Sequence, residues 1–410
     1  MSDDVGAQGC PADLDLAAWF GDWDAELRRC AEQHWWANGA DQTGSPMPVV
    51  LGWAESREVL NDRRLSPRSF VDDMLASGLS PQSAAQVSPL FSRHGDDHRH
   101  LRAVLSTAFT PKKVEQLRPA TRAIAERLAD GIVASDGVCE VVAAFAGPLP
   151  PEVFAVLFGL PVEDSDRMAA WASAIALAFT GSIASDDVAR VEAATAEMRE
   201  YGHERIAASR AAPGDDLVSR LLAAEVDAHH LSDDDVIAMI TGFVFAGAET
   251  TRRQMTAAIL LLADHPEDWE RLAAEPDLLP TAVDEILRLR GIVPALTRRA
   301  EEPFDRDGLE LEPHGRLMLS FSAANQDPER FDDPTAFQVD RADAHAHLTF
   351  GWGPHLCVGA GLARLELAEG LRALTTRFGP PVIEAIGPTG GFSTPDSVEV
   401  RFPVRAGGSA

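Results

Sequence analysis

The sequence predicts one large, mainly α-helical domain with small β-sheets. Three segments carry apolar residues at three- and four-residue spacing, which is typical of helices that bury one face: residues 112–132, 233–266 and 278–290. Strand-like stretches are short, at residues 47–53, 316–321 and 398–404. We find no internal repeat, low-complexity linker or long charge block that would divide the 410 residues into separate domains.

The segment 233–266 is predicted to be the central helix. Ser232 suits the N-cap position, and Asp233 to Asp235 suit the positive end of a helix dipole. The pattern continues for about 30 residues, which is longer than most helices of globular proteins. Its middle is apolar nearly all round, which favours burial through the centre of the molecule.

Composition narrows the function classes. Lys and Arg number 36 against 64 Asp and Glu, so the formal net charge of −28 opposes binding to nucleic acids and to anionic membranes. The N-terminus shows no signal peptide, and the most apolar window, residues 169–179, is shorter than the ~20 residues that span a bilayer. It is interpreted as a buried or lid helix. The four cysteines have neither metal-site spacing nor the pattern of a disulfide framework, and we expect a cytoplasmic protein.

The most informative stretch is FGWGPHLCVGAGLAR, residues 350–364, in which glycines flank Cys357 and a helical pattern follows. A helix N-terminus stabilises a thiolate, and glycines let a large planar group approach the backbone. The residues alone leave three hypotheses: a buried structural cysteine, a nucleophile with His355 nearby in sequence, and a thiolate ligand to iron.

The stretch resembles the cysteine loop of the cytochrome P450 family, F-G-x-G-x-H-x-C-x-G-x-x-L-A-R. The matching positions are Phe350, Gly351, Gly353, His355, Cys357, Gly359, Leu362, Ala363 and Arg364. The resemblance extends from about position 45 to the C-terminus. It implies a single haem domain over residues 1–410, with residues 1–20 flexible and no fused reductase. The implied fold is a helical prism in which haem b lies between the long central helix and the cysteine-loop helix, with Cys357 as the axial iron ligand.

A second motif is EILR, Glu285 to Arg288, which matches the family's E-x-x-R helix. Residues three apart share a helix face, so the two side chains are expected to pair. The family adds a third polar partner from the segment FDDPTAFQVDR, where Ala336 occupies the usual position. Arg341 is the candidate substitute.

A third motif, FAGAETT (245–251), matches the family's A-G-x-D/E-T segment in the central helix. By this resemblance Ala246 and Gly247 leave room above the porphyrin, and Glu249 and Thr250 are the acid–alcohol pair of dioxygen activation. A carboxylate in an apolar helix needs a partner or water.

The resemblance also implies the remaining cofactor contacts. His98, Arg102, Arg298 and His355 are expected to hold the haem propionates, with Arg299 as an alternative register for Arg298. The family's usual D-P-P-E before His98 is replaced by residues 94–97, HGDD, so this loop is expected to differ in shape. Further contacts with the haem are expected from Ala246, Gly247, Phe350, Gly351 and Gly359.

The implied function is a monooxygenase that inserts one oxygen atom from O2 into a small organic substrate, with hydroxylation as the expected outcome, in secondary-metabolite biosynthesis or small-molecule catabolism. O-demethylation, epoxidation, oxidative coupling and nitration on the same scaffold stay open. A non-catalytic haem sensor, the rival of a different class, would not need the acid–alcohol pair. Electrons would come from NAD(P)H through a separate ferredoxin and ferredoxin reductase, docking on a patch with Lys112, Lys113 and Arg364. The protein is expected to be a monomer.

The substrate pocket is expected to be mostly apolar, since most residues at the matching positions are. These positions are Phe245, Gly242, Val293, Pro294, Ala295, Leu296, Phe392, Ser393 and Thr394. Arg93 or His94 could bind a polar end of the substrate, although loop charges more often face solvent. The loop 70–94 and the segment 169–186 are expected to form the lid.

Overall fold

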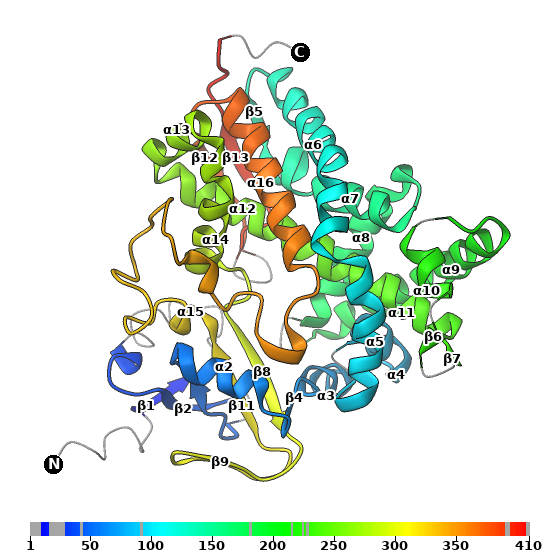
Figure 1. Cartoon of the computed structure of the whole chain (residues 1–410), viewed down its shortest axis with the longest axis vertical. Coiled ribbons are helices and arrows are strands. Elements are labelled where there is room, and N and C mark those ends of the chain that lie inside the picture. Colours follow the sequence, from blue (N-terminus) through cyan, green and yellow to red (C-terminus); the bar gives the residue numbers. More distant parts are fainter. Residues whose placement is uncertain are drawn as a thin grey trace. The chain divides into compact units, whose positions relative to one another are not determined.

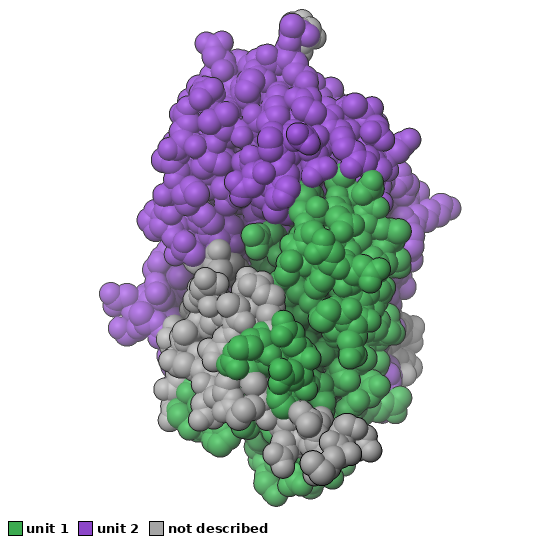
Figure 2. Space-filling view, turned by 90° about the vertical axis from the view of Figure 1, so that its left-hand side faces the viewer, with its two compact units in different colours: residues 1–70, 284–357 green, residues 71–283, 358–410 purple. Residues whose placement is uncertain are grey.

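The computed structural model describes residues 10–15, 29–41, 44–90, 93–179, 183–214, 216–223, 225–226, 229–389 and 394–406. The chain forms two compact units: residues 1–70 with 284–357, and residues 71–283 with 358–410. Figure 2 colours the first green and the second purple.

The first unit is built on a six-stranded sheet of order β1–β2–β3–β11–β8–β4. The strands are β1 (Cys10–Asp15), β2 (Trp36–Ala40), β3 (Val49–Val50), β11 (Arg316–Ser320), β8 (Ala295–Ala300) and β4 (Leu65–Ser66). The antiparallel pair β8–β11 is the most regular part, and β11 pairs with β3 in parallel. Alternate side chains such as Leu317 and Leu319 enter a core shared with Phe321 and Leu348.

The hairpin of β9 (Phe304–Arg306) and β10 (Leu309–Leu311) belongs to the same unit. Its turn residues Asp307 and Gly308 both have positive φ, 43° and 86°, as a tight two-residue hairpin requires. The helices are α2 (Trp53–Asn61), the C-terminal part of α14 (Leu279–Arg290), α15 (Phe321–Ala324) and the short 3₁₀ turns η7 (Ala344–Ala346) and η8 (Gly353–His355).

The second unit is mostly helical. Its helices are α3 (Ser69–Ala76), α4 (Pro81–Val87), α5 (Gly95–Ala108), α6 (Pro111–Val133), α7 (Leu149–Phe158), α8 (Ser165–Ala176), α9 (Ser185–Ala211), α10 (Leu217–Ala223), α11 (Asp233–Val244), α12 (Thr250–Ala263), α13 (Pro266–Ala274) and α16 (Ala360–Arg377). Helix α16 packs along α6, as Figure 1 shows. Small sheets join β12 (Val382–Ile386), β13 (Val398–Arg401) and β5 (Val138–Glu140), and β6 (Glu225–Val226) with β7 (His229–His230).

The central helix is confirmed and continuous: α11, a π-helical turn η5 (Phe245–Glu249), and α12. Its start is a capping box. The Asp235 N–H donates to Ser232 Oγ (3.1 Å), and the Ser232 N–H donates to Asp235 Oδ2 (3.2 Å). A single π turn inside a long helix frequently marks a functional site, and this one coincides with the FAGAE sequence.

The other helix predictions are confirmed at α6, α14 and α8, whereas the expectations for residues 70–94 and 47–53 are wrong. The segment 70–94 is largely helical (α3 and α4), not a loop. The strand predicted over residues 47–53 contains only β3, and its last predicted residue, Trp53, already begins α2. Residues 10–15 form β1 within the N-terminal segment that was expected to be flexible.

Cys30 is disulfide-bonded, which departs from the expectation for the cysteines, whereas Cys139 and Cys357 are not.

Across the described ranges, no helix is both long enough and apolar enough to cross a membrane.

Candidate active site

The cysteine loop, residues 350–357, is held by its own backbone. The Cys357 N–H donates to the Phe350 carbonyl oxygen at 2.8 Å. Gly351 and Gly353 have φ of 71° and 70°, a left-handed backbone conformation that residues other than glycine rarely adopt. The Cys357 side chain is exposed and is not in a disulfide. The hypothesis of a buried structural cysteine is therefore wrong, and the sulfur is accessible to a ligand.

Two other loop residues lie at the ends of short helical elements, and their predicted contacts with haem stay predictions. Gly359 is the N-cap of α16, and His355 ends the 3₁₀ turn η8. The Phe350 ring lies 5.5 Å from the His347 ring, centroid to centroid. Leu356, next to Cys357, is 39% exposed, so an apolar side chain and a thiol are presented together.

Glu285 and Arg288 form a fully buried ion pair in the first unit. Arg288 Nε lies 2.7 Å from Glu285 Oε2, and Arg288 Nη2 lies 2.8 Å from Oε1. Arg341 supplies the third partner, with its Nε 3.0 Å from Glu285 Oε1. Ala336 contributes only its carbonyl oxygen, which accepts from both arginines at 3.2 and 3.1 Å. The charges are thus compensated, as burial requires.

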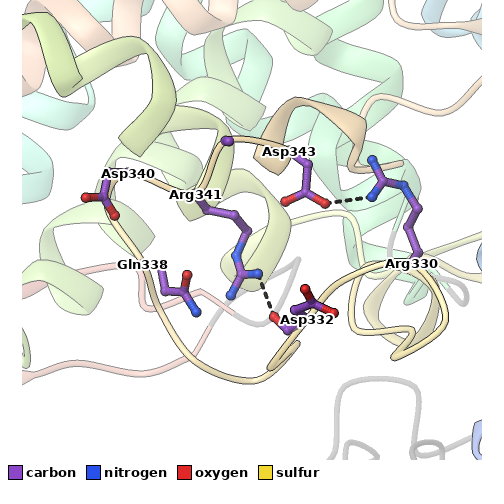
Figure 3. A pocket seen from close by; sticks show the side chains of 7 residues that line it. Arg330, Asp332, Gln338, Asp340, Arg341 and Asp343 are labelled. Carbon is purple, nitrogen blue, oxygen red and sulfur yellow. Dashed lines mark hydrogen bonds and ion pairs between the residues drawn. The ribbon is translucent and has the colours of Figure 1, made fainter.

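A cavity of about 300 Å³ lies beside this cluster (Figure 3). It is lined by Arg330, Asp332, Gln338, Asp340, Arg341, Ala342 and Asp343. Three of its charged side chains are engaged with neighbouring groups: Arg330 pairs with Asp343 at 2.6 Å, and Arg341 donates to the Asp332 carbonyl at 2.7 Å. This polar lining differs from the apolar pocket that was expected, and none of the predicted pocket residues belongs to it. We assign no substrate to it.

In the second unit, Glu249 is buried and held by two arginines that the sequence analysis missed. Arg252 donates to both carboxylate oxygens, Nε at 2.9 Å and Nη2 at 2.6 Å, and Arg253 Nε donates at 2.6 Å. Burial raises the pKa of Glu249, but the hydrogen bonds and charges of Arg252 and Arg253 outweigh it and leave the pKa below its ordinary value. Glu249 is therefore a carboxylate at neutral pH.

Arg253 extends this network to the chain before β13. Its Nη1 donates to the Thr394 carbonyl at 3.0 Å, and its Nη2 lies 3.1 Å from Asp396 Oδ1. The signal in the sequence was a pair of arginines three and four residues after Glu249, which places them one helical turn away.

The opposite side of the π turn is open. Ala246 is exposed and Thr250, four residues on, is half-buried, whereas Phe245 and Ala248 are buried. The Thr250 hydroxyl donates to the Ala246 carbonyl at 2.5 Å. A buried helix therefore has one accessible face, carrying a methyl group and a hydroxyl group.

Gly247 packs closely against α7. A Cβ there would lie 1.9 Å from Phe154 Cε2, so helix packing by itself accounts for the absence of a side chain. That Ala246 and Gly247 leave room above the porphyrin stays a prediction.

The predicted propionate ligands lie in both units. In the first unit Arg298 is 3% exposed, and burial lowers the pKa of its guanidinium to about 10. Its described hydrogen-bond acceptor is its neighbour's carbonyl, Thr297 O, at 2.9 Å. Arg299, the alternative register, instead pairs with Glu301 at 3.0 Å.

In the second unit His98 and Arg102 lie one turn apart on α5. His98 is buried, and its pKa is lowered to about 4 by burial and then by the charges of Arg102 and His94. The imidazole is therefore neutral at neutral pH and can donate or accept one hydrogen bond through each nitrogen. Arg102 is half-buried.

The predicted pocket residues of the second unit are already engaged with neighbours. The Phe245 ring stacks on Phe179 at 4.2 Å, and Arg93 pairs with Asp235. A Cβ at Gly242 would meet Pro89 Cδ at 2.7 Å, so this glycine too serves packing. His94 is the N-cap of α5, and Thr394 is buried. In the first unit Val293, Pro294 and Leu296 are half-buried and Ala295 is buried, while Phe392 and Ser393 lie outside the described residues.

The comparisons with known proteins agree with this geometry. The cytochrome P450 family model matches residues 41–382. Luteothin monooxygenase of Streptomyces thioluteus is 32% identical over 392 residues, covering 93% of each chain. The polyketide biosynthesis cytochrome P450 PksS of Bacillus subtilis is 32% identical over 300 residues, 73% of this chain and 72% of that protein. The crystal structure of CalO2 matches with a TM-score of 0.85 at 26% identity, over 95% of this chain and 98% of that one.

The matched region contains the cysteine loop, the Glu285–Arg288 pair and the FAGAETT segment. The chain belongs to the cytochrome P450 family and is a haem-thiolate monooxygenase.

Proposed function

We propose that this monooxygenase hydroxylates a small, largely apolar organic molecule at the open face formed by Ala246 and Thr250. The observation that carries the proposal is the contrast across the π turn, in which one face exposes a hydroxyl group and the other holds an ionised glutamate. The family match spans parts of both units, which supports a single haem domain. A cytoplasmic location and a monomeric state stay predictions.

The residues present fit a haem. Arg298 is a buried guanidinium for which the described residues supply a carbonyl but no carboxylate, and a propionate is an anion of the required kind. Cys357 is an exposed thiol beside an exposed leucine, as suits a ligand that is covered only when the cofactor binds. Cys357 would then bind the iron, and Arg298, His355, His98 and Arg102 would hold the propionates. When bound, the haem supplies the centre at which O2 is activated.

The chain's own residues would control protons. Glu249 is ionised, and taking up a proton from water would weaken the charge-assisted hydrogen bonds that its carboxylate accepts from Arg252 and Arg253. The Thr250 hydroxyl currently donates to Ala246 O, and rotation about its Cα–Cβ bond would release this donor toward the open face. A positioned proton donor of this kind typically raises the reaction rate by ~10²–10⁴-fold.

The test is Thr250→Ala, with Thr256→Ala as the matched control. Thr256 lies on the same helix and makes the same type of bond, from its hydroxyl to the Arg252 carbonyl at 3.0 Å. We expect Thr250→Ala to consume NAD(P)H but to release mainly hydrogen peroxide, whereas Thr256→Ala should couple consumption to product as the parent does. Undiminished coupling in Thr250→Ala would overturn the proton-delivery role.

We propose a substrate from natural-product biosynthesis. The names of two relatives support this, since one acts on luteothin and another belongs to polyketide biosynthesis. The apolar character of the predicted pocket residues fits such molecules. Titration of candidate compounds against the haem absorption spectrum tests the proposal, and a set of natural-product substrates that causes no spectral shift would count against it.

We also propose that electrons arrive from NAD(P)H through a separate acidic ferredoxin and its reductase. Lys112 and Lys113 begin α6, and Arg364 lies in the first turns of α16. These two helix starts are close, because a Cβ at Gly361 would lie 3.7 Å from the Val114 side chain. Together they form a basic patch on a chain of net charge −28.

Charge reversal at Lys112 and Arg364 should raise the KM for ferredoxin at low salt. It should also remove or invert the parent's rise of KM with salt, because the attraction that salt screens is gone. Arg190→Glu, on the exposed side of α9, is the matched control for charge. If Arg190→Glu changed the KM for ferredoxin as much as reversal at Lys112 and Arg364, the proposed docking site would be contradicted.

A further inference from the structure

Arg57 is enclosed by two tryptophans of the first unit. Its guanidinium carbon lies 4.6 Å from the Trp53 ring centroid and 3.9 Å from the Trp352 ring centroid. Trp53 and Arg57 are one turn apart on α2, whereas Trp352 belongs to the cysteine loop. Arg57 Nε is buried and finds no hydrogen-bond partner among the described residues. The side chain is therefore held by ring faces rather than by a carboxylate.

The same helix touches the backbone of the cysteine loop. A Cβ at Gly353 would lie 2.5 Å from Asn61 Oδ1 and 3.0 Å from the Leu60 carbonyl oxygen. The loop thus meets α2 at two levels, through the Trp352 ring near its middle and through Gly353 at its last turn. Because the Cys357 N–H donates to the Phe350 carbonyl and Gly353 lies against the end of α2, we expect displacement of the Trp352 ring to shift the loop that carries Cys357.

Helix α2 is itself anchored. The Trp53 N–H donates to Asp327 Oδ2 at 2.8 Å, and its indole N–H donates to the Ala346 carbonyl at 2.9 Å. The guanidinium carbon of Arg330 lies 5.2 Å from the Trp53 ring centroid and 4.8 Å from the Phe331 ring centroid, so Arg330 connects these two rings.

The guanidinium carbon of Arg288 lies 5.1 Å from the centroid of the same Phe331 ring. Aromatic rings and guanidinium groups therefore alternate from the cysteine loop to the buried Glu285–Arg288 pair. Planar guanidinium groups stack on rings in a way that an ammonium group cannot, which explains arginine at position 57.

We propose that Arg57, clamped between Trp53 and Trp352, is a positioning residue that holds the cysteine loop so that Cys357 stays bound as a thiolate. The clamp acts through Trp352 and does not touch the sulfur. This inference rests on the proposed ligation of haem by Cys357.

The experiment uses the haem-loaded protein and follows the reduced carbon monoxide complex. Arg57→Lys keeps the charge and loses the planar stack, and Arg57→Met keeps most of the side-chain volume. The matched control is Arg64→Lys, because Arg64 lies 4.8 Å from the Phe304 ring and pairs with Asp62, both outside the cysteine loop. The measured quantity is the rate at which the long-wavelength thiolate band converts to the shorter-wavelength band of a lost thiolate, together with Tm.

Both Arg57 variants should convert several-fold faster than the parent, while Arg64→Lys converts at the parent's rate. Trp352→Phe, which keeps a ring face, should stay close to the parent, and Trp352→Leu should behave like Arg57→Met. The double variant Arg57→Met/Trp352→Leu should convert no faster than either single variant, since the two residues form one contact.

Parent-like conversion in the Arg57 variants, or acceleration matched by Arg64→Lys in proportion to lost Tm, would overturn the clamp. If an Arg57 variant does not fold, the comparison of Trp352→Phe with Trp352→Leu still tests the clamp. Absence of the thiolate band in the parent protein would instead refute the ligation by Cys357, so the two failures are distinguishable.

Discussion

Two buried glutamates, one in each unit, are each held by two arginines, but their surroundings differ. In the Glu285 cluster the side chains of Glu285 and Arg288 are 0% exposed, and the spare N–H groups donate to backbone carbonyls. In the Glu249 cluster Arg252 is 14% exposed, and Arg253 reaches an aspartate that is 52% exposed. A closed network can only support the fold, whereas one that reaches water can exchange protons. The difference distinguishes a structural use of the same residue set from the catalytic use that we propose for Glu249.

The largest effect is expected in the closed cluster. Arg288→Ala leaves Glu285 buried with one arginine, and breaking a buried pair costs about 3–5 kcal/mol. The variant should lose most of its haem and unfold at much lower denaturant concentration. Chemical denaturation of the parent and of Arg290→Ala, a nearby arginine in the last turn of α14, provides the comparison. A loss below 1 kcal/mol in Arg288→Ala, or an equal loss in both variants, would refute the structural role of the pair.

A smaller effect is expected in the open cluster. Glu249→Gln replaces the charged acceptor of the arginine hydrogen bonds, and a hydrogen bond to a charged group is worth about 1.5–3 kcal/mol. Arg253 keeps Asp396 as a partner in this variant. The folded-state pKa of Glu249 lies below its unfolded value, so its stabilising contribution is present above the unfolded pKa and is lost as pH falls through the folded pKa.

The free energy of unfolding of the parent should therefore exceed that of Glu249→Gln at neutral pH, and the gap should close in acid. Denaturation at several pH values measures this difference. A gap that is constant down to acidic pH would show that the carboxylate is not held as described.

A third buried glutamate, Glu366 of α16, sharpens the comparison because none of the described arginines pairs with it. It is 1% exposed, its Oε2 accepts from no described residue, and burial raises its pKa well above the ordinary value. Its effect on stability has the opposite sign. The folded carboxyl stays neutral while the unfolded one ionises, so stability is lost as pH rises above the unfolded pKa.

Glu366→Met should raise the free energy of unfolding at neutral pH by about 1 kcal/mol, the low end of the cost of an unsatisfied buried polar group. The gain should shrink as pH falls below the unfolded pKa, as thermal unfolding at two pH values would reveal. A destabilised variant at neutral pH would mean that Glu366 has a partner outside the described residues.

Sequence alone identified the parts of the site that are local. Helical spacing is enough to pair Glu285 with Arg288, and the glycine pattern places Cys357 in a turn before α16. Arg341 could be named only as a candidate, because it reaches Glu285 from 56 positions away along the chain. The spacing of Arg252 and Arg253 after Glu249 did not reveal whether these arginines face solvent or the carboxylate.

Contacts that depend on the distance between helices were beyond prediction. The role of Gly247 follows from how closely Phe154 approaches, and the Trp352–Arg57 stack joins residues almost 300 positions apart. Such facts arise from packing, which the periodicity of one segment does not encode.

The account depends most on Cys357 as the thiolate that binds haem iron. The direct measurement is the absorption spectrum of the reduced carbon monoxide complex in the parent, in Cys357→Ser and in Cys139→Ser. Cys139 is a suitable control, since burial and then the nearby Glu140 and Glu399 raise the pKa of its thiol to about 12. We expect the long-wavelength thiolate band in the parent and in Cys139→Ser and its loss in Cys357→Ser. Persistence of that band in Cys357→Ser would show that Cys357 is not the iron ligand.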